Sequence, residues 1–242
     1  MIDIIVPVYN NLWYTKLFLL SLGKQTFKDY RLIIINNWSN DGTLQFLENF
    51  SKKLPIEIIN NEKNLWYVKA INIWLRITRQ QYVLLGNNDT ILPSNLLAKL
   101  VNCIWEYDIV SVYSNKKHDS LNNSELLVEY SGEPSIKDIN LFAKNLDLKF
   151  KDTIIDVDAV FWHCLFMKRS IIDEVWFLDE RFWVWNYDDI DFCKRAQNKW
   201  FKIWLIKWAF IYHFCHATFD YLWVDIEDIL KKNFILFNEK WQ

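Results

Sequence analysis

Asparagine and aspartate residues follow an apolar run at positions 87–89, directly after Gly86. A buried strand that ends in oxygen ligands suits a hard divalent cation, which needs only one or two protein carboxylates when a bound substrate supplies the other oxygens. The same residue types are also common in tight turns. The stretch therefore predicts either a site for Mg²⁺ or Mn²⁺ at Asp89 or an ordinary turn at the end of a strand.

A second stretch places three carboxylates within four positions, at Asp188, Asp189 and Asp191. Neighbouring carboxylates repel one another and are costly to bury unless a cation or a shared proton offsets their charge. They could cap an exposed helix, because the positive end of the helix dipole favours acids. They could equally supply a general base that removes a proton from a hydroxyl. Both interpretations stand.

Two further groups of polar side chains follow apolar runs. His213 ends such a run, where a histidine is either structural or completes a metal site. A zinc site there would lack the usual paired spacing of its ligands. Asn36 and Asn37 open the polar segment 36–43, whose short side chains can bind a base or a ribose and also cap the helix that follows.

The elements that position these residues alternate between strand and helix patterns. Strands are expected over 2–8, 31–35, 56–59, 82–85 and 109–113, and helices over 12–23, 43–50, 68–77 and 94–105. Such repeats predict an α/β fold with a mostly parallel sheet flanked by helices. In these sheets, ligands bind at the carboxyl ends of the strands, where the polar residues above are expected to lie.

The second half of the chain is less regular. Residues 115–153 are polar and weakly periodic, which predicts a variable excursion with short helices. The remaining expected elements are a strand over 158–167, a helix over 186–198, a short strand over 208–213 and a terminal amphipathic helix over 226–237.

Composition bounds the class of protein. The chain has 242 residues, of which 52% are hydrophobic and 24% are charged, as expected for one α/β domain. The net charge of −2 disfavours a nucleic-acid partner. Four cysteines without a C-x-x-C pair fit a reducing cytoplasm. No signal peptide and no run of about 18 apolar residues is found, so we predict no membrane span. Peripheral contact with the inner face of a membrane stays open.

Together, these motifs resemble the family 2 glycosyltransferases of the GT-A fold. The likeness spans nearly the whole chain, from Ile5 to about Thr218. It is carried by Ile5–Asn10, Asn36–Thr43, Asn64-Leu65-Trp66-Tyr67, Leu84–Thr90, Phe177–Phe182 and Asp188–Cys193.

The resemblance implies a GT-A (Rossmann-like) sheet in which residues 1–113 form a nucleotide-sugar-binding half. Residues 114–242 would form the half that binds the acceptor and supplies the catalytic base, with a C-terminal extension on the acceptor side. The implied reaction is inverting transfer of a sugar from a nucleotide-diphosphate donor to a hydroxyl of a glycan, lipid-linked or other acceptor, in cell-surface polysaccharide synthesis. The alternative is a sugar- or nucleotide-binding relative that has lost activity. No oligomeric state is indicated.

The resemblance also implies roles for particular residues. Asp89 and His213 would hold Mn²⁺ or Mg²⁺, and Asp189 would be the base, with Asp188 and Asp191 as alternatives. Asn36 stands where the family usually has aspartate. The residues implied in nucleotide-sugar binding are Pro7, Tyr9, Asn10, Asn36, Asn37, Asn64, Asn87 and Asn88.

Glycine and tryptophan occur in unusual numbers, with 4 glycines and 14 tryptophans. An average composition of about 7% glycine predicts roughly 17 glycines in a chain of this length. Either the protein is rich in tryptophans that stack on sugars, or a codon that means glycine in the source has been rendered as tryptophan. The tryptophans that fall where the family pattern has glycine are Trp38, Trp66, Trp74, Trp162, Trp176, Trp183, Trp185 and Trp200, and Trp204, Trp208 and Trp223 are further candidates. Trp13, Trp105 and Trp241 are candidates for genuine tryptophans.

Overall fold

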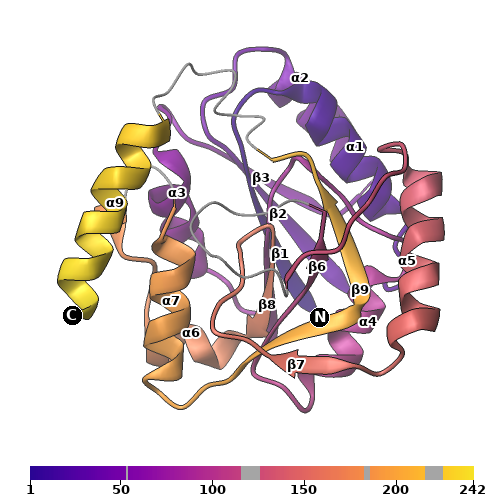
Figure 1. The fold of residues 1–242 in the computed structure, drawn as a ribbon. Helices are drawn as coiled ribbons and strands as arrows, with labels where there is room; N and C mark the ends of the chain where they lie inside the picture. The colour runs from indigo at the N-terminus through magenta and orange to yellow at the C-terminus, as the bar shows by residue number, and fades with distance from the viewer. Residues whose placement is uncertain (53, 116–125, 183–185, 216–225) are drawn as a thin grey trace.

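The computed structural model describes residues 1–242 apart from 53, 116–125, 183–185 and 216–225. Its core is a sheet of nine strands within the described residues, in the order β3-β2-β1-β4-β8-β6-β9-β5, with β7 paired to β9. Helices cover both faces of this sheet (Figure 1). The expected α/β fold is therefore confirmed.

The first half of the sheet is parallel, as the sequence predicts. Its strands are β1 (Ile2–Val8), β2 (Tyr30–Asn36), β3 (Ile56–Asn60) and β4 (Tyr82–Gly86), and its helices are α1 (Leu12–Gly23), α2 (Thr43–Phe50) and α3 (Trp66–Leu75). The register pairs Val8 with Asn36 and Asn36 with Asn60. The polar residues that follow these strands therefore meet at one edge of the sheet.

The second half contains more elements than the sequence predicts. They are β5 (Thr90–Ile91), α4 (Leu96–Ile104), β6 (Ile109–Ser114), α5 (Ile136–Phe150), β7 (Ile154–Asp156), β8 (Cys164–Lys168), α6 (Arg169–Val175), η2 (Glu180–Phe182), α7 (Asp188–Gln197), β9 (Ile203–His213) and α9 (Ile226–Trp241). β8 runs antiparallel to both β4 and β6, while β6 and β9 are parallel. The sheet is thus mixed rather than mostly parallel.

The excursion expected at residues 115–153 holds one long helix within its described part, 115 and 126–153, where short helices are expected. The 15-residue α5 begins where the Ser135 side chain accepts a hydrogen bond from the backbone N–H of Asp138. Its buried residues Ile139, Ala143 and Leu146 follow helical spacing. Because so few of its residues are apolar and buried, the period is weak in the sequence.

Two strands differ in length from the expectation. β8 occupies only the end of the expected strand 158–167, and β9 is an 11-residue strand rather than a short one. The pairing of β9 with β6 shifts register between Val112 and Tyr113. This irregularity interrupts the alternation of apolar and polar residues, so the start of β9 is not visible in the sequence pattern.

Alternate residues of the strands build two apolar cores. Ile4 and Val6 of β1 face α1 and α4, whereas Ile5 faces α3. Figure 1 shows α3, α6 and α7 on one side of the sheet and α1, α2 and α4 on the other. Within the part of the chain that the structure describes, no helix is both long enough and apolar enough to cross a bilayer.

Candidate active site

Asp89 and His213, the two residues implied as metal ligands, lie next to each other. Asp89 follows β4 and His213 ends β9, and the short strand β5 pairs with β9 so that Thr90 is opposite His213. The Asp89 Oδ1 atom is 3.2 Å from Nε2 of His213. The backbone N–H of Phe214 also donates to the Asp89 carbonyl at 3.0 Å. The pairing of β5 with β9, two strands far apart in the sequence, therefore holds Asp89 next to His213.

The Asp89–His213 pair fits a divalent cation that takes most of its ligands from a substrate. Both residues are buried, and Asn87 Nδ2 lies 3.4 Å from Nε2 of His213. Among the described residues, no group of three or more His, Cys, Asp or Glu side chains is arranged to hold a metal. One carboxylate and one imidazole leave coordination positions that diphosphate oxygens and water would fill.

Asp188 and Asp189 form a buried pair at the start of α7. Oδ2 of Asp188 accepts a 2.6 Å hydrogen bond from Nε1 of Trp162, and Oδ1 of Asp189 accepts a 2.9 Å bond from the backbone N–H of Ile190. Burial raises the pKa of Asp188 to about 7. Burial also raises the pKa of Asp189 well above its usual value, and the negative charge of Asp188 raises it further.

The backbone that leads into α7 is strained. Asn186 and Tyr187 both have positive φ angles, of 79° and 68°. Such conformations are uncommon for residues other than glycine and tend to cluster at functional sites. Asn233 of α9 donates a 3.1 Å hydrogen bond to the Asn186 carbonyl, which helps to hold this turn.

The Tyr67 hydroxyl lies within electrostatic range of both groups of acids. Burial raises the pKa of Tyr67 well above its usual value, and the charges of Asp188, Asp189 and Asp89 raise it further. The hydroxyl is buried and has no hydrogen-bond partner among the described residues. One phenol that is close enough to sense all three carboxylates indicates that the end of β4 and the start of α7 converge. Tyr67 was missed as a site residue, although it lies in the segment that begins at Asn64.

Asp191 has a different environment from its two neighbours. It is completely buried, and its Oδ2 accepts a hydrogen bond from Arg195 at 2.9 Å while its Oδ1 lies 2.6 Å from Lys240 Nζ. Trp241 Nε1 donates a third bond, at 2.9 Å. Because its lone pairs are already engaged by cations and an indole, this geometry favours Asp188 or Asp189 as the base.

Asn37 is the centre of an amide network at the carboxyl edge of the parallel strands. Its Nδ2 donates to Oδ1 of Asn64 at 2.7 Å, and its Oδ1 accepts from Asn61 and from the backbone of Leu65. Asn36 donates from Nδ2 to Asn60 at 3.0 Å. These amides join the loops after β2 and β3, so Asn36, Asn37 and Asn64 shape the edge through contacts with one another.

The other implied binding residues border the same edge. Pro7 and Tyr9 are partly exposed at the end of β1, while Asn10 and Asn88 are buried. Oδ1 of Asn10 accepts from the backbone of Asn40, and its Nδ2 is buried without a hydrogen-bond partner among the described residues. Asn88 instead donates to Thr15 at 3.0 Å. Tyr9 is thus accessible to a ligand, whereas Asn88 ties the loop to α1.

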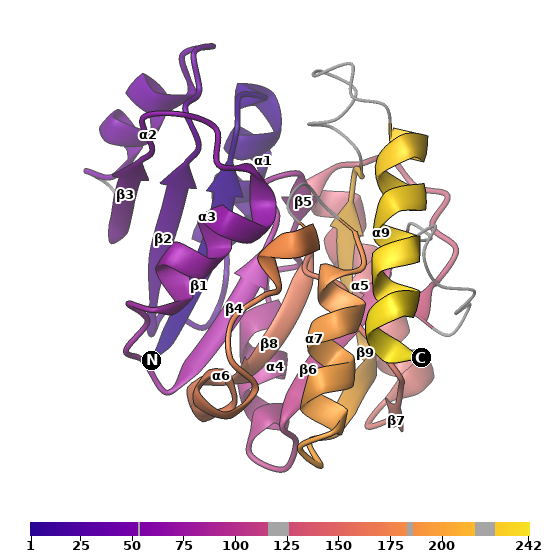
Figure 2. The same ribbon diagram turned by 90° about the vertical axis from the view of Figure 1, so that its left-hand side faces the viewer.

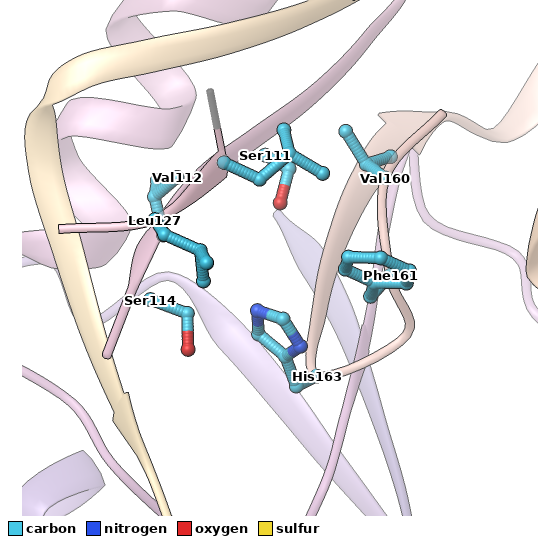
Figure 3. A pocket seen from close by; sticks show the side chains of 8 residues that line it. Ser111, Val112, Ser114, Leu127, Val160, Phe161 and His163 are labelled. Carbon is cyan, nitrogen blue, oxygen red and sulfur yellow. The ribbon is translucent and has the colours of Figure 1, made fainter. Parts of the chain in front are cut away.

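A small pocket borders the His213 side of this region. It has no enclosed space large enough for a water molecule, and Figure 3 shows Ser111, Ser114 and His163 around it. The rings of His163 and His213 are 4.9 Å apart. His163 thus lies beside the Asp89–His213 pair, and a histidine within an irregular segment carries no motif that would place it there.

A mixed sheet with helices on both faces and acids at its edge is the GT-A class of fold, and comparison with solved structures agrees on this fold. The Staphylococcus aureus TarS fragment 1–349 in complex with UDP-GlcNAc superimposes with a TM-score of 0.62 at 21% identity, covering 87% of this chain and 57% of that one. The mannosyltransferase PcManGT of Pyrobaculum calidifontis, in complex with GDP-Man and Mn²⁺, gives a TM-score of 0.65 at 14% identity, covering 88% and 56%.

The chain belongs to glycosyl transferase family 2, whose model matches residues 3–176. It is similar to the uncharacterized glycosyltransferase YfnE of Bacillus subtilis, with 28% identity over 188 residues. That match covers 71% of this chain and 46% of YfnE. The chain therefore spans about half the length of this relative.

Proposed function

We propose that this protein transfers a sugar from a nucleoside-diphosphate donor to an acceptor hydroxyl, with inversion at the anomeric carbon. The observation that carries the proposal is that Asp89 lies beside His213 at the end of β4, while Tyr67 is within electrostatic range of Asp89, Asp188 and Asp189. Acids gathered at the carboxyl edge of an α/β sheet lie where such folds bind their ligands. The division into a donor half, 1–113, and an acceptor half, 114–242, is part of this proposal.

Asp189 is the proposed general base. Because its pKa is raised, the ionised form of Asp189 binds a proton more tightly than an ordinary carboxylate and is a stronger base. The acceptor oxygen forms its bond to the anomeric carbon as the bond to the diphosphate breaks, and the acceptor proton passes to Asp189. A single displacement of this kind inverts the anomeric configuration. The negative charge of Asp188 would raise the pKa of Asp189 further.

Asp89 and His213 would hold Mn²⁺ or Mg²⁺. A divalent cation there would offset the negative charge that develops on the leaving diphosphate. Tyr9 and Pro7 would lie against the nucleotide, because they are the partly exposed side chains at the end of β1. The amide network around Asn37 would keep the loops beside them in place.

The relatives suggest the class of donor and acceptor. The solved TarS fragment contains UDP-GlcNAc, and PcManGT contains GDP-Man with Mn²⁺. TarS is named as a poly(ribitol-phosphate) β-N-acetylglucosaminyltransferase. We therefore propose a UDP- or GDP-sugar as donor and a hydroxyl of a cell-surface glycan or lipid-linked acceptor, used in the cytoplasm near the membrane.

The test is a panel of nucleotide sugars measured by thermal shift with and without Mn²⁺, followed by an assay for released nucleoside diphosphate. A ligand that binds only the folded state raises the melting temperature. We expect one donor class to raise it in the presence of Mn²⁺ and to be turned over. Binding without turnover, with all acceptors tried, would favour a non-catalytic relative. Absence of any nucleotide effect would contradict the proposal.

A further inference from the structure

Four tryptophans have backbone conformations that favour glycine. Trp38, Trp66, Trp176 and Trp200 have φ angles of 73°, 61°, 70° and 69°. Residues other than glycine rarely adopt positive φ, and a bulky side chain there is an outlier. Glycine adopts the same conformations without a steric penalty.

Trp200 occupies a glycine position in a helix-ending motif. After α7, the backbone N–H of Phe201 donates to the Ala196 carbonyl at 3.1 Å, and that of Trp200 donates to the Gln197 carbonyl at 2.8 Å. These two bonds form a Schellman motif, in which the left-handed residue is usually glycine. The Trp200 side chain is 92% exposed, so no packing compensates for the conformation.

Trp176 is still less compatible with its backbone. It ends α6 with φ 70° and ψ −174°, a region that is essentially restricted to glycine. Its backbone N–H donates to the Ile172 carbonyl at 2.9 Å, so this conformation occurs directly after the last hydrogen bond of the helix. Its side chain is mostly exposed.

Trp38 and Trp66 lie at the proposed nucleotide-binding edge. Trp38 follows Asn37, and its side chain is more than half exposed. Trp66 begins α3, where its backbone N–H donates to Asn64 Oδ1 at 2.8 Å and its carbonyl accepts from Asn37 at 3.4 Å. The backbone of Trp66 is therefore held by the amide network, whichever side chain it carries, and Trp38 directly follows Asn37 at the centre of that network.

Two partly buried tryptophans give independent support. The indole N–H groups of Trp74 and Trp208 are buried and have no hydrogen-bond partner among the described residues. A buried indole N–H usually finds a partner. Trp74 stands where the family pattern suggests glycine, and Trp208 is one of the further candidates.

We infer that positions 38, 66, 176 and 200 carry glycine in the protein as its source makes it, a glycine codon having been rendered as tryptophan. We further infer that glycine at positions 38 and 66 lets a nucleoside diphosphate approach the backbone at the end of β2 and the start of α3. This second part rests on the proposed function. The counts of 4 glycines and 14 tryptophans fit the same substitution.

Peptide mass spectrometry of the protein isolated from its source tests the first part directly. We expect the peptides that contain positions 38 and 200 to have the mass that glycine gives. Tryptophan at either position would overturn the assignment there.

Recombinant variants test the conformational argument. Trp176→Gly and Trp200→Gly should each raise the melting temperature by about 2–8 °C. A residue other than glycine in the left-handed region costs about 1–2 kcal/mol, and each kcal/mol changes the melting temperature of a domain of this size by about 2–4 °C. Trp105→Gly is the matched control, because Trp105 is also exposed at a helix end but has φ −61°. A gain in the control, or no gain in the two variants, would contradict the inference.

The double variant Trp38→Gly/Trp66→Gly tests the nucleotide part. It should bind UDP or GDP, with Mn²⁺, at least about tenfold more tightly than the tryptophan chain. The Trp176→Gly/Trp200→Gly variant should raise the melting temperature and leave this affinity unchanged. Equal affinity in both backgrounds overturns the nucleotide part. If no nucleotide binds to any variant, the proposed function fails as well, while the gains in stability still support glycine at these positions.

Discussion

The Lys240 ammonium group lies 2.6 Å from Oδ1 of Asp191, so the last turn of α9 is joined directly to α7. Trp241 Nε1 donates to the same carboxylate oxygen, and the rings of Tyr187 and Phe237 are 5.2 Å apart. The two helices lie side by side in Figures 1 and 2. The C-terminal helix therefore holds the helix whose first turn carries the two candidate bases.

Asp191→Asn should destabilise the protein. The change leaves Arg195 beside a neutral amide, whereas Lys240 keeps its ion pair with Asp179 at 2.8 Å. Losing one partner of a charged hydrogen bond at a buried site costs about 1–3 kcal/mol. Chemical denaturation measures the loss. Asp173→Asn is the control, because its ion pair with Arg169 is exposed and such pairs contribute about 0–1 kcal/mol. Equal stability of the two variants would show that Asp191 is not a structural anchor.

Asp189→Asn should abolish most transfer while donor binding persists. An amide cannot accept the acceptor proton, and loss of a general base typically lowers the rate about 10²–10⁴-fold. Turnover is measured as nucleotide release, and donor affinity is measured by thermal shift. Asp188→Asn separates the two acids, since it should lower turnover less. A matching loss of donor affinity in Asp189→Asn would argue for a role in binding instead.

Activity and stability should respond to pH in opposite directions. The pKa of Asp188 is raised to about 7 and that of Asp189 is raised as well. Between about pH 4 and 7 the unfolded chain releases the Asp188 proton while the folded chain keeps it, so rising pH lowers stability by up to about 1.4 kcal/mol per pH unit for this group. Below that range both states are protonated and the contribution is complete. The raised pKa of Asp189 acts in the same direction. Turnover should rise with pH, because the base must lose its proton.

Denaturation of Asp188→Asn across pH checks the sign. Its stability should fall less than that of the parent chain as the pH rises through this window. A parent chain that becomes more stable from pH 4 to 7, relative to the variant, would contradict the raised pKa values.

Asp89→Asn and His213→Gln should each remove the Mn²⁺-dependent part of nucleotide binding. Their atoms lie 3.2 Å apart and are the proposed ligands. A ligand present at 100 times its Kd stabilises the folded state by about 2.7 kcal/mol, and this gain should disappear in both variants when UDP is added with Mn²⁺. His163→Gln, which changes the neighbouring ring, should keep the response. Loss of the response only in His163→Gln would show that the metal binds at His163 and not at Asp89 and His213.

Several features of this protein could be predicted from local patterns. The strands and helices of the first half were found because each apolar run and each helical spacing is a property of neighbouring residues. The orientation of β8 and the full length of α5 and β9 were not found, since these depend on which strand a segment pairs with and how much of a helix is buried. Tyr67 was not found for a related reason, because a phenol becomes a candidate site residue only through carboxylates that other elements bring to it.

By itself, the sequence determined the α/β class, the family likeness, the strand-end location of the polar residues and the imbalance between glycine and tryptophan. Only the tertiary structure decided that Asp89 meets His213, that Asp191 pairs with Lys240 while Asp188 and Asp189 do not, and that four tryptophans occupy left-handed backbone. The physical reason is that a carboxylate acts as base, ligand or anchor according to its burial and the charges within a few ångströms. Those distances are set by contacts between segments that lie far apart along the chain.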